Sequence, residues 1–386
     1  MKCRHGLRPI TTFLAGLLVV LSASSVRAQT PALQPDVRVR LGYFAVWGDQ
    51  RDGSFRQDHL GQGRVQAGLT WRAAPAVRLQ ARLATRFSTT QEAFRFRTPD
   101  YQPGPEGLAP GDIALDQLFA TWQPAASSEL RAGRMQLAFP LPDVLSKSLQ
   151  RNDGPNVDDH WVDALHARTD LPGVGRAHLA LIHTSRAGVA TAFRPPLTFD
   201  GESSRAALFA VLEGRAPVGL LVHRAIHLTV LPRALPDADG TRSAYLAASM
   251  QGAVALPLSE GFFDGSRVMV AGEVGWTPTT PTNSRLRLPG TGHAGGAAGQ
   301  LSVNLLSLAD GAHDLGLYAG IAEPGWLLSP DIRPNNFESE ARYYWRFARN
   351  QRLDLRIRRR SDLVAPEGSV QRRTEWDSFL RYNVRF

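Results

Sequence analysis

The side chains most able to act on a solute are arginines, and several segments place them at every second position. Within residues 36–47, for example, Arg38 and Arg40 alternate with valine and leucine. A guanidinium group stays charged at neutral pH and binds carboxylate or phosphate through two parallel hydrogen bonds. The sequence therefore predicts a surface that attracts anions. The arginines expected on it are Arg38, Arg40, Arg64, Arg72, Arg78, Arg82, Arg86, Arg342, Arg346, Arg356, Arg358, Arg381 and Arg385.

An alternation with a period of two is typical of β-strands, which present successive side chains to opposite faces. Residues 376–386 show it most clearly, because Trp376 begins an apolar and aromatic row while Asp377 and Arg381 belong to the opposite row. Ten steps of about 3.3 Å, tilted by about 40°, rise about 25 Å, the height of the apolar band of a membrane barrel. With Phe386 as the last residue, the segment is typical of the closing strand of an outer-membrane barrel.

The same alternation recurs along the chain, and tight turns alternate with long connections rich in Gly, Pro, Asp and Asn. The predicted fold class is therefore all-β, a transmembrane antiparallel β-barrel of about 16 strands (14–18), with short periplasmic turns and long extracellular loops. The expected strands are 36–47, 63–72, 76–88, 114–123, 128–138, 161–169, 175–184, 204–214, 217–231, 242–251, 266–277, 298–308, 312–321, 338–349, 352–361 and 374–386.

Some segments fit this pattern poorly. Residues 128–138, 175–184 and 204–214 do not reveal which of their faces is outward, and Arg224 and Arg359 fall on the face expected to be outward. Either a bulge shifts the register there, or these long side chains reach the polar boundary of the membrane. A soluble β-sandwich is the alternative fold, but it gives no reason for ionic residues along one whole strand face.

A closed sheet of sixteen strands is expected to enclose an aqueous lumen rather than a packed core. The first three and the last three strands adjoin when such a barrel closes, so their arginines should form one basic patch on the wall. A pore wall of this sign favours anions. The alternative is that each arginine pairs with an acid of a loop and only shapes the lumen.

The start of the chain is typical of a secretory signal. Three cations within the first eight residues precede a mostly apolar stretch, 10–20, and small residues occupy the −3 and −1 positions of a cleavage site after Ala28. We expect a signal peptide over 1–28 and an outer-membrane β-barrel over 29–386, exported through the periplasm to the outer membrane of a Gram-negative bacterium.

Other chemistries find less support. The net charge of +9 falls to +5 once the four cations of residues 1–28 are removed, and the remaining charges are spread without a nucleic-acid motif. The only cysteine, Cys3, lies in the expected signal peptide. His178, His223 and His227 could line the lumen, but their spacing does not define a metal site. We expect no enzyme, no cofactor, no metal and no nucleic-acid partner.

Taken together, the mature chain resembles the sixteen-stranded porins of Gram-negative bacteria, and the subfamily, anion-selective or phosphate-selective or similar to the saccharide porins, stays open. In that family the third long loop folds into the barrel and narrows it. The resemblance therefore implies that loop 139–160 forms the constriction and faces Arg78, Arg82 and Arg86. It also implies a homotrimer. The expected constriction residues are Lys147, Arg151, Asp153, Asp158 and Asp159.

Three functions fit these expectations. The first is a passive diffusion channel for small hydrophilic solutes, anionic or neutral, with an anion preference set by the arginines and a surface in contact with lipid and lipopolysaccharide. The second is an exporter or importer of an acidic saccharide through the same barrel. The third is a structural or adhesive barrel with a closed lumen, which would carry no current.

Overall fold

A computed structural model gives the fold and describes residues 32–88, 95–96, 112–150, 161–183, 195–198, 206–214, 217–236, 240–258 and 265–386. For residues 86–88, 95–96 and 112–114 the structure describes the backbone and not the side chains. The expected signal peptide, 1–28, and four of the expected constriction residues, Arg151, Asp153, Asp158 and Asp159, lie outside the described residues.

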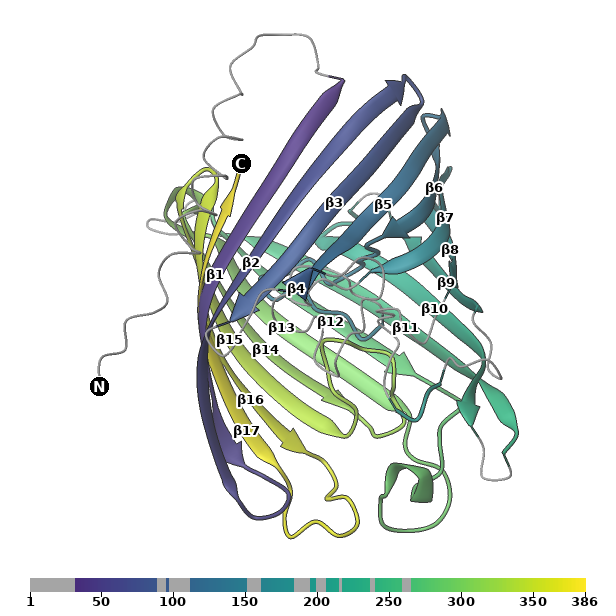
Figure 1. The fold of residues 1–386 in the computed structure, drawn as a ribbon, viewed down its shortest axis with the longest axis vertical. Coiled ribbons are helices and arrows are strands. Elements are labelled where there is room, and N and C mark those ends of the chain that lie inside the picture. The colour runs from purple at the N-terminus through teal and green to yellow at the C-terminus, as the bar shows by residue number, and fades with distance from the viewer. Residues whose placement is uncertain are drawn as a thin grey trace.

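Sixteen antiparallel strands form a closed barrel (Figure 1), which confirms the predicted fold class. Each predicted segment overlaps one of them, and a further short strand, β4 (Arg95–Phe96), pairs with β5 in parallel. The barrel strands are β1 (Leu33–Asp49), β2 (Phe55–Ala74), β3 (Val77–Ser88), β5 (Asp112–Ala125), β6 (Ser128–Met135), β7 (Val162–Leu171), β8 (Gly175–His183), β9 (Ala206–Glu213), β10 (Leu221–Pro236), β11 (Arg242–Pro257), β12 (Arg267–Trp276), β13 (Ala297–Ser307), β14 (His313–Ala322), β15 (Asn336–Ala348), β16 (Gln351–Asp362) and β17 (Thr374–Arg385).

Two short helical turns lie in the connections around β13: η2 (Ser284–Leu286) and α2 (Leu308–Gly311). Among the described residues, no helix has the length and apolar character needed to cross a membrane.

The barrel closes between β1 and β17, which pair from Arg38 opposite Arg385 to Asp49 opposite Thr374. β17 also pairs with β16, and β1 pairs with β2. The first three and the last three strands therefore adjoin, as predicted, and their inward side chains share one stretch of wall.

The outward face of this sheet is apolar. Tyr43, Leu79, Leu355 and Leu380 are exposed, and they occupy the strand faces that alternation predicts to be outward. Apolar surface spread over a whole sheet is unfavourable in water but not in lipid. Because the barrel is closed, no strand edge is left with unpaired backbone groups in the membrane. The exterior therefore fits the hydrocarbon layer of a membrane.

The structure resolves strands that the sequence left ambiguous. Leu181 is exposed on β8 and Leu212 on β9, which fixes the outward face of both. Arg224 shares the outward face of β10 with exposed Ile226, and its side chain lies over Gly214, just beyond the end of β9. Arg224 is therefore placed at a rim, where a long side chain can reach the polar boundary.

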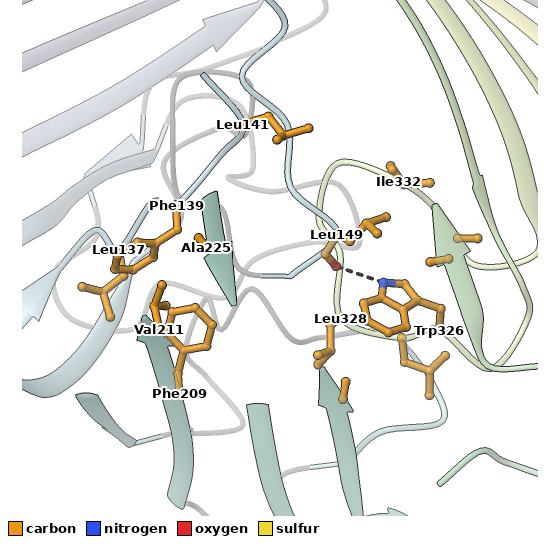
Figure 2. Close-up of a cluster of buried hydrophobic side chains, with 14 of the residues drawn as sticks. Leu137, Phe139, Leu141, Leu149, Phe209, Val211, Ala225, Trp326, Leu328 and Ile332 are labelled. Atoms are coloured by element: carbon orange, nitrogen blue, oxygen red, sulfur yellow. Dashed lines mark hydrogen bonds between the residues drawn. The ribbon is translucent and has the colours of Figure 1, made fainter. Parts of the chain in front are cut away.

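A packed apolar core lies inside the barrel, on the side of β6 to β15. Two connections fold inward to form it, 137–150 after β6 and 323–335 between β14 and β15. Figure 2 shows Phe139 near Phe209, and on the other side Trp326 donating from Nε1 to the carbonyl of Leu149 at 2.9 Å. The expectation of a lumen without a packed core is therefore corrected for this side of the barrel.

The wall beneath these connections is lined by small residues that leave room for them. Because the inner face there is apolar as well, the strands are apolar on both faces and lose the alternation that reveals orientation. This is why 175–184 and 204–214 gave no orientation from sequence. The small buried residues of this wall include Ala180, Ala207, Ala225, Ala247, Ala253, Ala271 and Ala298.

Gly275 of β12 shows how closely the second connection approaches the wall, because a Cβ atom there would lie 2.6 Å from Trp326 Cη2. We expect Gly275→Ala to displace Trp326 and lower the free energy of unfolding by about 1–3 kcal/mol, the usual cost of overpacking. Denaturant unfolding in detergent micelles measures the loss. The matched control is Gly299→Ala, whose Cβ would approach nothing closer than 3.9 Å. Equal unfolding midpoints for the two variants would contradict the close packing.

Candidate functional site

The inward faces of β15, β16 and β17 carry a dense array of charged side chains. Alternation along the three strands places eight arginines and six carboxylates there, an excess of two positive charges. Cross-strand register sets Arg342 opposite Arg356 and Arg358 opposite Asp377. We call this array the lumenal charge network: Glu338, Glu340, Arg342, Arg346, Arg352, Asp354, Arg356, Arg358, Arg360, Asp362, Glu375, Asp377, Arg381 and Arg385.

Asp377 is the centre of the network. Its carboxylate accepts hydrogen bonds from Arg358 Nε at 2.8 Å and from Arg360 Nη2 at 2.9 Å, and it also pairs with Arg356. Arg360 forms a further ion pair with Glu375 at 2.6 Å. These groups are largely shielded from water, which strengthens the attraction. Most of the network's charge is thus compensated within the wall, and a small positive excess is left.

Aromatic rings hold part of this positive charge. Phe379 faces inward from β17, and the guanidinium carbons of Arg381 and Arg356 lie 3.8 Å and 4.1 Å from its ring centre. Arg381 also lies 4.8 Å from the ring centre of Phe44 on β1. A cation over an aromatic face is attracted by the ring without losing its charge. The rings therefore orient guanidinium groups at the seam without neutralising them.

Lys147 fixes the inward-folded segment 137–150 to the network. Its Nζ lies 2.9 Å from a carboxylate oxygen of Glu340, pairs also with Glu338, and sits 4.0 Å from the ring centre of Tyr318. All of these side chains are buried. A buried ammonium group needs such compensation because its desolvation is costly. Lys147 is therefore an anchor of the segment to β15.

Backbone amides of the same segment donate hydrogen bonds to side chains of β12, of β13 and of the second inward connection. Leu149 donates to Glu273 of β12 at 2.7 Å, and Val144 donates to Asn304 of β13 at 3.1 Å. Ser148 donates to Asp331 of the second inward connection at 3.0 Å. The described part of the expected constriction loop, 139–150, therefore folds into the barrel and is fixed along its length.

The partner of Lys147 differs from the one implied by the resemblance, which placed it opposite Arg78, Arg82 and Arg86. Arg82 is instead bound to Asp116 at 2.6 Å, and Arg78 approaches Glu129 at 3.4 Å. The side chain of Arg86 is outside the description. Both described arginines pair with acids of neighbouring strands, whereas Lys147 pairs with the two acids of β15.

Asp116 reaches Arg82 because of a bulge. Register between β3 and β5 shifts between Arg82 and Leu83, so that Gln117 is paired with Arg82 and Leu115 with Leu83. Asp116 is the extra residue, and it turns into the barrel beside Gln117, where both are buried. Strict alternation could not have placed both side chains inward.

Four of the other predicted arginines lie at the seam between β1 and β17 or near the end of β15. Arg38 and Arg385 both pair with Asp36, at 2.9 Å and 2.8 Å, and Arg40 donates to Asn383 at 2.9 Å. Arg346 pairs with Asp314 of β14. The structure thus brings the predicted arginines of β1, β16 and β17 together, while Arg78 and Arg82 belong to a separate group of ion pairs around β5 and β6.

The strand carboxylates that compensate the arginines of this wall were not predicted from the sequence. Only acids of the loops were expected as partners for these arginines. The signal was present for most of the strand carboxylates, since they occupy the same inward positions as the arginines. The wall acids in described ion pairs include Asp36, Asp116, Glu129, Asp314, Glu338, Glu340, Asp354, Asp362, Glu375 and Asp377.

Asp143 adds a titratable contact to the inward segment. One of its carboxylate oxygens accepts a hydrogen bond from Ser302 of β13 at 2.7 Å. Burial raises the pKa of Asp143, and the Ser302 hydrogen bond opposes part of that rise. With a raised pKa, this group stabilises docking fully at low pH, and its contribution is lost as pH rises through the folded-state pKa.

No group of three or more metal-binding side chains is arranged to hold an ion within the described part of the chain.

No protein-family model matches the chain, and no curated protein matches its sequence. Solved structures do match its fold. Pseudomonas putida OprB has a TM-score of 0.61 at 9% identity, covering 92% of this chain and 94% of OprB. The outer membrane channel DcaP of Acinetobacter baumannii has a TM-score of 0.57 at 9% identity, covering 94% of this chain and 100% of DcaP. An anion-selective porin from Comamonas acidovorans has a TM-score of 0.51 at 8% identity, covering 91% and 99%.

At these identities the similarity is one of fold. The chain has the barrel fold of the Gram-negative outer-membrane porins, and the subfamily stays open.

Proposed function

We propose that this chain, whose barrel is that of the outer-membrane porins, is a passive diffusion channel for small hydrophilic solutes in a Gram-negative outer membrane. The observation that carries the proposal is the opposite character of the two faces of one closed wall. Apolar residues such as Leu355 and Leu380 face out, and the lumenal charge network faces in. The exterior fits lipid and lipopolysaccharide, and the interior fits water. Diffusion through such a wall needs neither a chemical step nor a cofactor.

An anion preference is the finer part of the proposal. It is supported by the excess of two positive charges at inward positions of β15 to β17, with Lys147 as a further cation. Guanidinium groups held by Phe379 and Phe44 keep their charge at the seam. The proposed pore-lining residues are Arg38, Arg40, Arg78, Arg82, Arg86, Arg342, Arg346, Arg356, Arg358, Arg381 and Arg385.

Conductance across a planar bilayer tests both parts. With a salt gradient across the refolded protein, we expect steady ohmic steps and a reversal potential of the sign that indicates anion preference, because fixed positive charge raises the local anion concentration. A reversal potential of cation sign would contradict the anion preference and leave the channel intact. A folded barrel that carries no current would contradict the channel itself.

One observation favours a second candidate, a structural or adhesive barrel with a closed lumen. The core formed by 137–150 and 323–335 packs against β6 to β15, so part of the interior is filled. Among the described residues, the core contains none from β1, β2, β3, β16 or β17, and this side carries the lumenal charge network. The passage is therefore proposed to run along that side.

Two further expectations belong to the same proposal. Cleavage after Ala28 predicts that the protein isolated from outer membranes begins at Gln29, which N-terminal sequencing checks. The homotrimer implied by the resemblance predicts a mass about three times that of the chain in detergent, which light scattering checks.

A further inference from the structure

Four histidines gather on the inner wall close to the point where segment 137–150 leaves β6. They are His166 of β7, His178 of β8, and His223 and His227 of β10. The rings of His166 and His178 are stacked, with Nε2 of His166 3.2 Å from Nδ1 of His178. Only 4%, 9% and 1% of His166, His178 and His227 is exposed.

Phe139 of the segment is docked among these rings. Its ring meets His178 edge-on with centres 5.0 Å apart, and His227 edge-on with centres 6.2 Å apart. Phe209 of β9 closes the group, with its ring centre 5.4 Å from that of Phe139. Phe139, near the start of the inward segment, therefore contacts two imidazoles of the wall.

A hydrogen-bonded chain fixes the backbone at the same place. Gln251 of β11 donates from Nε2 to the carbonyl of Phe139 at 3.0 Å. Its Oε1 lies 3.1 Å from Nε2 of His223. His223 therefore orients the amide that binds the segment.

The contacts between Phe139 and the histidine rings fit imidazoles that are neutral. Neither ring nitrogen of His227 has a hydrogen-bond partner among the described residues, and the same is true of Nδ1 of His166. Protonation of His227 would create a buried positive charge whose two N–H groups have no hydrogen-bond acceptor in the described part of the chain. In the pair of His166 and His178 one nitrogen must accept the shared hydrogen bond, so the two rings cannot both be protonated and keep it.

The charged groups around the rings do not remove this conflict. The positive charges of Arg131 and Arg168 disfavour protonation of His166. The negative charge of Glu129 favours it, but Glu129 already forms ion pairs with both arginines.

Glu213 of β9 lies 3.1 Å from Nε2 of His178 and also acts on His227. Arg176 of β8 is paired with Asp170, and the residue facing from β11 is the uncharged Gln251. Among the described groups around the rings, Glu213 is thus the one carboxylate left to compensate charge on the imidazoles. Its single negative charge can offset the positive charge of one protonated ring.

We propose that His166, His178, His223 and His227 form an acid-sensitive latch that holds the start of segment 137–150, around Phe139, against the wall at neutral pH and releases this part at acid pH. This regulation rests on the proposed channel. Protons bind better to the released state, where water reaches the rings, and a ligand shifts an equilibrium toward the state that it prefers. The released segment enters the passage beside the lumenal charge network and lowers the current. Asp143 acts in the opposite sense, so the histidines must be tested by substitution.

The first test records single-channel current between about pH 7.5 and about pH 5, the range in which imidazoles titrate. We expect closures to appear on acidification, with the ratio of closed to open time rising by up to about tenfold per pH unit for each linked proton. His227→Phe keeps the packing without a titratable group and should abolish the closures, and His166→Gln serves if the first variant folds poorly. His59→Gln, an exposed histidine of β2, is the control and should close like the parent.

A second measurement does not depend on current. The only natural cysteine, Cys3, lies in the expected signal peptide, so Leu141→Cys supplies a single buried thiol in the segment, and Ser54→Cys supplies an exposed reference. We expect the reaction rate of the Leu141→Cys variant with 4,4′-dithiodipyridine, divided by that of the reference, to rise by up to about tenfold per pH unit on acidification. His227→Phe should suppress the rise.

The outcomes separate the two proposals. A barrel that never conducts but shows the histidine-dependent rise in thiol reaction contradicts the channel and supports the latch. A channel that conducts at both pH values, with a thiol rate ratio that does not change or that changes equally in His227→Phe, overturns the latch and leaves the channel standing.

Discussion

Lys147→Met is expected to free segment 137–150 from β15 and to lower the free energy of unfolding by about 3–5 kcal/mol, the usual cost of removing one partner of a buried ion pair. Lys147 lies between Glu338 and Glu340, and both carboxylates are buried. The nearest cations left to them are Arg358 at 3.7 Å from Glu338 and Arg342 at 2.6 Å from Glu340. Neither arginine forms an ion pair with both acids, so the mutual repulsion of the two carboxylates is offset less than when Lys147 lies between them.

Two readouts follow the loss of this anchor. Denaturant unfolding in micelles should show a lower midpoint, and single-channel records should show larger current fluctuations because the segment moves within the lumen. The control combines Lys147→Met with Glu338→Gln, which removes one buried charge of each sign, keeps Glu340 paired with Arg342 and should restore much of the stability. If Lys147→Met alone unfolds and conducts like the parent, the segment is held by its other contacts and Lys147 is not an anchor.

Asp377→Asn is expected to have the second large effect, on ion selectivity. Arg356, Arg358 and Arg360 all pair with this carboxylate. Neutralising it raises the positive excess of the three strands from two to three charges and frees guanidinium groups to bind solute anions. The reversal potential in a salt gradient should therefore move further toward anion preference. The same change should lower stability by about 3–5 kcal/mol, because buried arginines lose their common partner.

Asp58→Asn is the matched control for this selectivity test. Asp58 pairs with Arg56 on β2, with side chains 51% and 53% exposed, so the variant changes the charge by the same unit at a solvated site. Its effect on stability should stay below about 1 kcal/mol, and its reversal potential should move less. If both variants shift the reversal potential equally, the lumenal charge network does not line the ion path. A shift toward cations in Asp377→Asn would contradict the proposed role of the arginines.

Much of the fold follows from local pattern. Sixteen segments separated by tight turns and long loops predict sixteen strands, and several of them show in their own residues the period of two of a wall between lipid and a polar interior. Where the two faces differ strongly, as in 36–47 and 374–386, the orientation of every side chain follows too. Adjacency of the first and last strands is a consequence of closure, and it predicts that Arg38 and Arg385 share one wall.

The tertiary structure decided what depends on contacts between distant segments. The inward faces of β8 and β9 pack on 137–150 and 323–335, so they are apolar, and alternation cannot separate an apolar core from lipid. Asp116 enters the barrel through a bulge, which breaks the period of two on which the sequence argument depends.

Lys147 meets Glu338 across 191 residues of sequence, and the path of a long loop fixes that contact. Similarly, β7, β8 and β10 bring His166, His178 and His227 to one patch of wall. Sequence alone thus determined the strands and, where alternation is clear, which charged side chains occupy inward positions, because both depend on neighbouring residues. The pairing of each charge and the docking of the inward segments were decided only in three dimensions, because burial and partners are properties of the packed chain.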